Sequence, residues 1–318
     1  MIELIIQNGE KFMEPAVEEG IVWETTRKGA PGKLTFSVLK DVALNFEEGN
    51  AVRLKKDGKN IFYGFVFTKK RSKEGLINVT AYDQLRYLKN KDTYVYTNKT
   101  ASEFIKMVAA DFRLNTGTIQ DTGYKIPSRV EDNKELFDMF QNALDLTMDN
   151  TKKMYILYDN FGKLTLRDLE KMKLDVLIDE ETGESFDYTS SIDSNTYNKI
   201  KLSYENEKTG KREIFIAQDN NNINNWGMLQ HFGTIKESTN GKIKADVLLS
   251  LYNRKTRNLS MKKAFGNIYV RGGNMVVVRL DLDDIKVMNY MLVNSVKHTF
   301  KESEHFMDLS LIGGDFVA

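Results

Sequence analysis

The chain has 318 residues, with 46 Lys and Arg against 45 Asp and Glu, and 41% of its residues are hydrophobic. This hydrophobic content supports packed cores and argues against general disorder, while the balanced charge provides no net field for nucleic acid or an anionic membrane. The absence of cysteine excludes disulfides, thiolate catalysis and cysteine metal sites.

The start of the chain, MIELIIQNGEKF, has neither a basic region nor an apolar segment of the signal-peptide type. No apolar run approaches the roughly 20 residues that a membrane span requires. We therefore expect a protein made in the cytoplasm without a recognisable export signal and without membrane insertion. At roughly 150 residues per domain, the length suggests two domains or three.

Residues 1–96 have the pattern of a small β-barrel or sandwich. Apolar residues alternate with polar ones in several short segments separated by polar turns, which is typical of half-buried strands at hairpin spacing. The clearest examples are Ile2, Leu4 and Ile6, then Leu34, Phe36 and Val38, and the segments IFYGFVF and LINVTAY. We expect a first β-barrel domain here.

Residues 97–175 change to an α+β pattern, which we interpret as a connecting domain. Thr100 and Glu103 stand at capping-box spacing and predict a first helix, and a second helix is expected from near Asp132. Their expected buried faces are Phe104, Ile105, Val108, Ala109 and Phe112 in the first, and Leu136, Phe140, Ala143, Leu144 and Thr147 in the second. The following segment predicts a β-hairpin with its turn at Asp159–Gly162.

Residues 176–318 return to β patterns with a helix inserted. A hairpin is expected around Thr209–Gly210, and the Asn-rich stretch Asp219–Gly227 is expected to be a loop. Residues 241–257 predict a third helix with Ile243, Val247, Leu248 and Leu251 inward. Strands follow from Leu259 to Leu311, so this region is expected to be a second β-barrel with a helical insertion.

One phrase occurs twice in the chain. GNAVRL at Gly49–Leu54 leads to YGFV at Tyr63–Val66, and GGNMVVVRL at Gly272–Leu280 leads to YMLV at Tyr290–Val293. Lysines follow at the same distance, at positions 70 and 297, and an alternating strand closes each copy: Ile77, Val79 and Ala81 in one, Met307, Leu309 and Leu311 in the other. This repeat is either a true internal duplication or two unrelated β-meanders with generic turns.

Residues that could carry catalysis or bind a metal are sparse. His298 and His305 could meet across a hairpin turn, but no third ligand accompanies them, and we expect ordinary strand histidines with exposed ends. Carboxylates cluster at Tyr82–Tyr87 and at Arg129–Asp138, where capping or solvent exposure is the usual explanation. No nucleophile elbow, phosphate-binding loop or zinc motif occurs. We expect no catalytic, cofactor-binding or metal-binding residues and no cofactor.

The order of these elements resembles a known family. The stretch Ala245–Leu280, ADVLLSLYNRKTRNLSMKKAFGNIYVRGGNMVVVRL, and the later VNSVKHTFKESEHFMDLSL are similar to the C-terminal part of baseplate hub proteins of contractile phage tails. These include the late control D family, the XkdQ/YqbQ type of defective Bacillus prophages and the hub half of VgrG. The N-terminal VWETTRKGAPGKLTFSVLKD and its following strands are similar too, so the resemblance covers nearly the whole chain.

The resemblance implies a non-enzymatic structural hub in the baseplate of a phage, prophage or tail-like bacteriocin. Such hubs are homotrimers in which two related barrels per chain make a ring of six similar units, a pseudo-sixfold symmetry adaptor that joins the hexameric tail tube to the central spike. Tube, spike and other baseplate proteins would be the partners. The chain ends at LIGGDFVA, so we expect any spike or hydrolase module on a separate polypeptide.

Under this reading Val52, Leu54, Val276, Val278 and Leu280 are core residues, not reactive ones. Two other functions remain open. The chain could be a tail-associated peptidoglycan hydrolase that uses Asp/Glu pairs. It could also bind host-surface carbohydrate, although Phe12, Trp23 and Trp226 are too scattered in sequence to suggest an aromatic platform.

Overall fold

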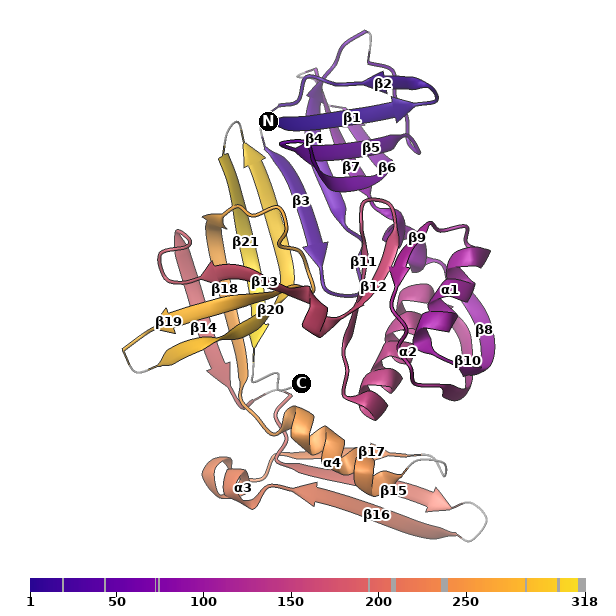
Figure 1. Ribbon diagram of the computed structural model, residues 1–318, viewed down its shortest axis with the longest axis vertical. Helices are drawn as coiled ribbons and strands as arrows, with labels where there is room; N and C mark the ends of the chain where they lie inside the picture. The colour runs from indigo at the N-terminus through magenta and orange to yellow at the C-terminus, as the bar shows by residue number, and fades with distance from the viewer. Residues whose placement is uncertain are drawn as a thin grey trace.

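The computed structural model describes residues 1–313 apart from 19, 43, 72, 74, 194, 207–209, 236–239, 284 and 302–303. Within this part of the chain, strands dominate and four α-helices are present. They form an N-terminal sheet, a C-terminal sheet, an α+β connecting region and a subdomain inserted into the C-terminal sheet (Figure 1). The two sheets belong to one continuous network of 13 strands.

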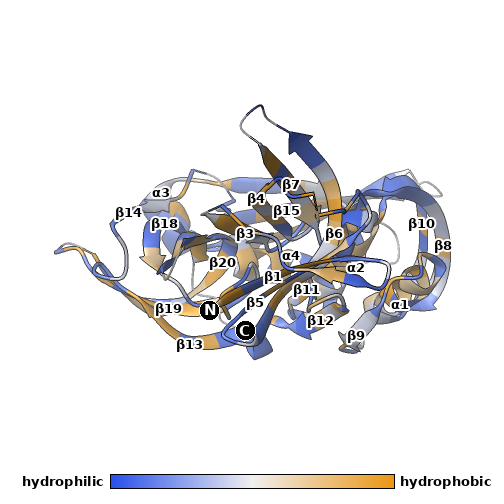
Figure 2. Ribbon diagram, turned by 90° about the horizontal axis from the view of Figure 1, so that it is seen from above, coloured by the Kyte–Doolittle hydropathy of each residue, from blue (hydrophilic) through white to orange (hydrophobic). Residues whose placement is uncertain are grey.

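The first sheet has the spatial order β2-β1-β5-β6-β7-β4-β3. Its strands are β1 (Ile2–Asn8), β2 (Lys11–Met13), β3 (Ile21–Thr26), β4 (Lys33–Leu39), β5 (Ala51–Lys56), β6 (Lys59–Arg71) and β7 (Leu76–Tyr82). Strand residues point alternately to the two faces, and the hydropathy colouring alternates along the strands in Figure 2. The inward residues share one core, which includes Leu4, Ile6, Leu34, Phe36, Val38, Val52 and Leu54.

The second sheet has the order β13-β19-β20-β21-β18-β14. Its strands are β13 (Lys173–Ile178), β14 (Ser185–Ser191), β18 (Thr256–Phe265), β19 (Met275–Asp281), β20 (Lys286–Lys301) and β21 (Glu304–Gly313). Val276, Val278 and Leu280 are at most 1% exposed in its core. The core assignment made from the sequence is therefore confirmed for both copies of the repeated phrase.

The two sheets have the same strand order. If β1, β3, β4, β5, β6 and β7 are matched in chain order with β13, β14, β18, β19, β20 and β21, their spatial orders are identical. One strand breaks the match, because β1 runs antiparallel to β5 whereas β13 runs parallel to β19.

The closed barrels expected from the sequence are not seen in the described residues. Strand pairing runs along an open path from β2 to β14 and returns nowhere to close a ring. Each sheet is nevertheless wrapped around its own core. In the first, Leu4 of β1 and Trp23 of β3 belong to the same apolar cluster although their strands do not pair. Side-chain packing, without a closing ladder of hydrogen bonds, holds these ends together.

The connecting region packs two helices against a two-stranded sheet (β8 and β10) and a three-stranded sheet (β9, β11 and β12). Its elements are η1 (Gln84–Lys89), β8 (Lys91–Lys99), α1 (Ala101–Asp111), β9 (Thr116–Ile119), β10 (Ile126–Glu135), α2 (Leu136–Thr151), β11 (Tyr155–Asp159), β12 (Leu164–Asp168) and η2 (Leu169–Met172). Thr100 and Glu103 form the reciprocal capping box that the spacing predicts. The β11–β12 hairpin is present with its turn after Asp159.

The second helix begins later than the sequence suggests. Residues near Asp132 lie in β10, which pairs with β8, and α2 starts at Leu136. The strand was missed because most of its side chains are polar, and its buried Glu131 is an acid held by ion pairs to Arg129 and Lys134. The predicted apolar face of α2 is correct, because its five named residues are all buried.

The insertion into the second sheet is larger than the single helix expected at 241–257. It comprises β15 (Lys199–Asn206), β16 (Lys211–Gln218), α3 (Asn220–Trp226), β17 (Gln230–Thr234) and α4 (Gly241–Tyr252). The helix ends at Tyr252 because β18 begins at Thr256, and Ile243 is 61% exposed, not inward. The Asn-rich stretch is a short helix, since Asp219 accepts a hydrogen bond from the Asn222 amide and caps it. Thr209 of the expected hairpin turn lies outside the described residues.

Candidate functional site: the joint between the two sheets

The joint between the sheets is made by the long strand β20. On one edge its first half pairs with β19, and residues 295–300 of the same edge pair antiparallel with β3. The other edge pairs with β21. Figure 1 shows the yellow strands β20 and β21 lying beside the indigo strand β3. A backbone ladder therefore joins regions more than 250 residues apart in the sequence.

The repeated phrase forms the same turn in both sheets. The Gly49 amide donates to the Val66 carbonyl at 2.8 Å, and the Gly273 amide donates to the Val293 carbonyl at the same distance. Both glycines have a positive φ, 91° and 96°, a conformation that non-glycine residues adopt only with strain. The glycine in each phrase is thus required by the backbone.

The asparagine of the phrase has the same role in both turns. Asn50 Oδ1 accepts a hydrogen bond from the Glu47 amide at 3.0 Å, and Asn274 Oδ1 accepts one from the Arg271 amide at 2.8 Å. An Asx-type bond of this kind fixes a turn locally. The matching residues differ in their surroundings, since Glu47 is exposed and Arg271 is enclosed.

A β-bulge also recurs at the matching place. The pairing of β6 with β7 shifts between Val66 and Thr68, and the pairing of β20 with β21 shifts between Val293 and Ser295. A bulge adds a residue and bends its strand. Each long strand therefore bends directly after its contact with the Gly-Asn turn. In β20, the residues beyond the bulge pair with β3 in place of β19.

Aromatic and histidine rings fill the joint beyond the bulge of β20. His298 stacks on Trp23 of the first sheet with ring centroids 4.7 Å apart. Phe300 stacks on His305 at 4.3 Å and belongs to the core of the first sheet. His298 is fully buried and His305 is 9% exposed, so the expectation of exposed histidines was wrong.

The hydrogen bonds of the histidine pair define its tautomers. The Val270 carbonyl lies 2.8 Å from His298 Nε2 and can only accept, so this nitrogen carries the proton. His298 Nδ1 then accepts from His305 Nε2 at 2.9 Å. Burial, with the neighbouring His305 second, lowers the pKa of His298 to about 3, and burial followed by Lys56 lowers the pKa of His305 to about 4. Both rings are neutral and structural.

A buried polar cluster ties both sheets to the connecting region. The Arg271 guanidinium donates to the Asp159 carbonyl at 2.7 Å and lies 4.3 Å over the Tyr158 ring. Asp83, at the end of β7, accepts hydrogen bonds from the Gly32 and Leu85 amides at 2.9 and 3.0 Å. Burial, with the Asp159 charge second, raises the pKa of Asp83 well above its usual range, and Arg271 opposes this rise. Several partners hold the cluster, although Arg271 Nε is buried without a hydrogen-bond partner. Such a buried network suits a structural joint.

No periodic pattern in the sequence indicated this cluster. Its members come from three separate regions. Asp83, the one carboxylate of the segment Tyr82–Tyr87, was expected to cap a helix or face solvent; it does cap η1, but it is also buried. The Gly-Gly pair after Arg271 was a usable signal. The Gly272 amide donates to Thr25 Oγ1 at 2.9 Å, and a Cβ on Gly272 would lie 2.3 Å from the Thr26 backbone. Two glycines in succession marked a close approach of another chain segment.

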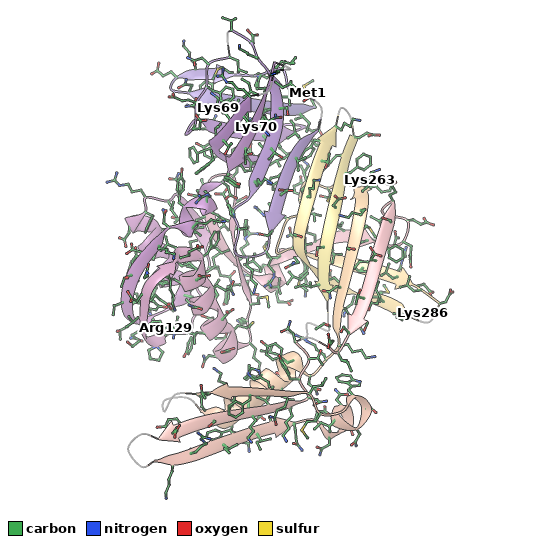
Figure 3. The ribbon with its side chains drawn as sticks, turned by 180° about the vertical axis from the view of Figure 1, so that it is seen from behind. Met1, Lys69, Lys70, Arg129, Lys263 and Lys286 are labelled. Carbon is green, nitrogen blue, oxygen red and sulfur yellow. The ribbon has the colours of Figure 1, made fainter. Side chains whose placement is uncertain are left out.

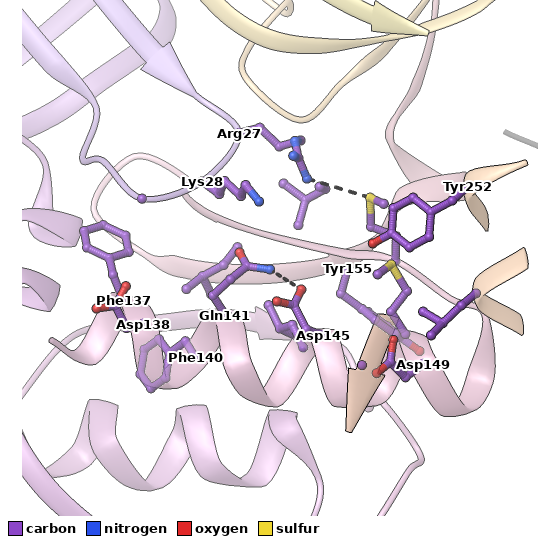
Figure 4. Close-up of a pocket in the computed structure, with 18 of the residues that line it drawn as sticks. Arg27, Lys28, Phe137, Asp138, Phe140, Gln141, Asp145, Asp149, Tyr155 and Tyr252 are labelled. Atoms are coloured by element: carbon purple, nitrogen blue, oxygen red, sulfur yellow. Dashed lines mark hydrogen bonds between the residues drawn. The ribbon is translucent and has the colours of Figure 1, made fainter. Parts of the chain in front are cut away.

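A cleft of about 830 Å³ opens between the β3–β4 connection, α2 and the inserted subdomain (Figure 4). Asp145 accepts from Gln141 Nε2 at 2.6 Å, and Asp149 pairs with Lys244 at 3.4 Å. Arg27 reaches Met154 Sδ at 4.0 Å. Burial lowers the pKa of Arg27, and the Asp145 charge opposes the fall. The lining mixes charged and apolar groups at a boundary between regions.

The two carboxylate clusters singled out in the sequence do not line this cleft together. Asp83 is 3% exposed and satisfied by backbone amides. Glu131 has no exposed surface and pairs with Arg129 and Lys134 at 3.0 and 2.9 Å. Neither acid faces a substrate-sized space. Of the second cluster, Asp138 alone lines the cleft.

Metal and membrane features are absent from the described part of the chain. No group of three or more His, Cys, Asp or Glu side chains there could hold a metal ion. Among the helices that the structure describes, none has the length and apolar character needed to cross a membrane.

Comparison with known sequences gives a family and two similar proteins. The YQBQ-like family model matches residues 21–312. The uncharacterized protein YqbQ of Bacillus subtilis (strain 168) is 32% identical over 98% of this chain and 97% of its own length. The phage-like element PBSX protein XkdQ of the same organism is 30% identical over 98% of this chain and 97% of its own length.

Solved structures share the fold at low identity. The 43 kDa tail protein of prophage MuSo2 from Shewanella oneidensis has a TM-score of 0.70 and 12% identity, covering 99% of this chain and 100% of that one. The E. coli c3393 protein, a type VI secretion component described as similar to the T4 tail proteins gp27 and gp5, has a TM-score of 0.57 and 8% identity, covering 99% of this chain and 78% of that one.

Proposed function

Because the chain belongs to the YQBQ-like family, we propose that it is a non-enzymatic baseplate hub of a contractile tail. The observation that carries the proposal is the identical spatial order of the six matched strands in the two sheets. The shared turn and bulge support it. We infer that the two sheets are related by duplication. We propose three domains close to the expected bounds of 1–96, 97–175 and 176–318. By the described elements, the first sheet ends at Tyr82, the connecting region runs from Gln84 to Met172, and the second sheet begins at Lys173.

A duplicated sheet solves a symmetry problem. A hexameric tube and a trimeric spike cannot both match one ring unless the mismatch is absorbed somewhere. Three chains with two similar sheets each offer six similar units to the tube and three whole chains to the spike. The hub would therefore be a homotrimer that adapts one symmetry to the other around an axial channel.

The relatives support a setting for the proposed hub. XkdQ is named as a protein of a phage-like element, and a tail protein and a secretion-system component share the fold. We propose that this chain resides in the baseplate of a phage, prophage or tail-like particle. Tube protein, spike protein and other baseplate proteins would be its partners.

Mass and binding measurements test the proposal. Purified protein, alone and mixed with the tube protein of its own particle, is analysed by light scattering after size exclusion. For the chain alone we expect a species of three times the 36.6 kDa chain mass, and for the mixture a heavier species that contains the tube protein. A strict monomer or dimer in both samples would rule out the hub as described.

A peptidoglycan assay tests the hydrolase alternative. Three carboxylates line the cleft and are placed to meet a large ligand: Asp138, Asp145 and Asp149. We expect no release of soluble peptidoglycan fragments by the purified chain. Release that Asp145→Asn or Asp149→Asn abolishes would overturn the non-enzymatic proposal.

A further inference from the structure

Two strand edges have no backbone partner in the described part of the chain. The stretch of β6 that follows its bulge, residues 68–71, pairs with β7 on one edge only. The strand β14 pairs with β18 on one edge only. In the joint, the corresponding strands β20 and β3 use the corresponding edges to pair with each other.

Beyond the bulge, the side chains of β20, whose edge is covered by β3, are more apolar and more buried than those of β6, whose edge has no partner strand. Val296 and His298 of β20 are buried, whereas Lys69 is half-buried and Arg71 is exposed on β6. The register of the two strands can be matched at Phe65 and Leu292. Phe65 pairs with the preceding strand β5 and the following strand β7, and Leu292 pairs with the preceding strand β19 and the following strand β21.

The same holds for the other edge. The paired residues across β21, β18 and β14 can be matched with those across β7, β4 and β3. In this match Tyr188 of β14 corresponds to Trp23 of β3, and Phe186 corresponds to Ile21. Trp23 and Ile21 are 4% and 5% exposed beneath β20. Tyr188 and Phe186 are only half-buried at the edge of the second core. The rings of Tyr188 and Phe186 are therefore partly exposed at the unpaired edge of β14.

We propose that the β6 edge of one chain pairs antiparallel with the β14 edge of a second copy, in the register of the β20–β3 joint. This inference rests on the proposed trimeric hub and states how its ring closes. In the joint, Ser295 lies opposite Thr26 and Lys297 opposite Glu24. The transferred register places Thr68 opposite Ser191, Lys69 opposite Ser190, Lys70 opposite Thr189 and Arg71 opposite Tyr188 of the second copy.

The chemistry of the two edges is complementary. The β6 edge carries the exposed cations Lys70 and Arg71, while Lys69 Nζ donates to the Phe46 carbonyl within its own chain. The β14 edge carries the exposed carboxylate of Asp187 beside Tyr188. Arg71 would lie on the Tyr188 ring as His298 lies on Trp23, a favourable cation–π contact. Charged edges discourage indiscriminate strand pairing, and an acidic partner makes the pairing selective.

The two edges cannot meet within one chain. Lys69 and Lys70 lie on the first sheet, and β14 is the outermost strand on the far side of the second sheet (Figures 1 and 3). A contact between different surfaces of identical chains is head-to-tail, and it produces a ring when the rotation closes. Strand addition at an open edge supplies main-chain hydrogen bonds at each step.

Cysteine cross-linking tests the register in a chain that has no native cysteine. The test variant is Lys70→Cys/Thr189→Cys, and the slipped control is Lys70→Cys/Ser190→Cys, because a one-residue slip turns the side chain to the other face. Glu24→Cys/Lys297→Cys is the positive control, since these residues face each other in the joint. Each variant is oxidised mildly and analysed by non-reducing electrophoresis and light scattering.

We expect the positive control to form a disulfide within one chain and the test variant to form covalent trimers, with at least a tenfold lower yield from the slipped control. A trimeric mass without covalent trimers from the test variant would overturn the edge pairing and leave the hub proposal standing. A monomer at every concentration, with the positive control closed, would overturn both.

Discussion

The first and second sheets share their backbone design but differ in what covers them. The Gly-Asn turn and the bulge recur because they depend on local backbone geometry, a positive φ and an extra residue. Side chains at matching positions follow their neighbours instead. Arg271 is enclosed beside the connecting region where Glu47 is exposed. The backbone geometry is therefore common to both sheets, whereas the burial of a side chain depends on which sheet it belongs to.

Among the matching positions, we expect the largest difference in unfolding free energy between variants of Arg271 and Glu47. Arg271→Ala leaves the buried Asp159 carbonyl without its hydrogen-bond donor and removes the positive charge that lowers the pKa of Asp83 and Asp159, so we expect a loss of about 1.5–3 kcal/mol. Glu47→Ala at the matching exposed position should stay within about 0.5 kcal/mol. Urea unfolding of both variants measures the difference. Equal losses would show that Arg271 does not stabilise the junction.

Gly49 and Gly273 occupy the same position in the two turns, so their alanine variants can be compared directly. A Cβ on Gly273 would lie 2.4 Å from Ile156 Cγ2, whereas a Cβ on Gly49 has nothing within 4 Å. Gly49→Ala should cost about 1–2 kcal/mol from the positive φ alone, and Gly273→Ala should cost about 1–3 kcal/mol more from overpacking. Thermal and urea unfolding test this order. A larger loss at Gly49 would contradict it.

Core valines should respond alike in the two sheets. Val52 and Val276 occupy matching register positions and both are fully buried. Val52→Ala and Val276→Ala should each reduce the unfolding free energy by roughly 2–4 kcal/mol. Unfolding followed by tryptophan fluorescence gives the values. A loss confined to one variant would argue against equivalent cores.

Acid should weaken the joint through its histidine pair. His298 and His305 have folded-state pKa values of about 3 and about 4, below the unfolded value of about 6.5. The unfolded chain therefore gains protons first, and the stabilisation present above pH about 6.5 is lost as the pH falls towards about 4. Between pH 7.5 and 5.5 we expect a loss of about 2 kcal/mol, allowing for the partial exposure of His305.

Histidine variants isolate this effect. The double variant His298→Gln/His305→Gln should lose most of the slope of unfolding free energy against pH in this window. His231→Gln, in the inserted subdomain, is the matched control and should keep the wild-type slope. An unchanged slope in the double variant would place the acid sensitivity elsewhere.

Sequence patterns anticipated the elements that local rules determine. The capping box at Thr100, the apolar face of α2 and the buried valines of both phrases follow from periodicity and spacing. The polar strand β10 and the short helix α3 were missed because ion pairs and an aspartate cap stabilise them, not an apolar pattern.

The joint could be predicted only in part. The repeated phrase indicated the position of the Gly-Asn turn, and the hairpin expected between His298 and His305 brought these two residues together. The burial of His298 could not be foreseen, because it depends on Trp23, which lies 275 residues earlier and stacks on it only in the folded chain. The Arg271 cluster likewise depends on Asp83 and Asp159 from two other regions.

The most direct test of the duplicated-sheet hub is to image the isolated assembly down its axis by electron cryomicroscopy. Averaged views should contain a ring of six similar densities made by three chains, with the first and second sheets alternating around the channel. A ring with only three sheet-like densities, or an assembly of any other number of chains, would contradict the account.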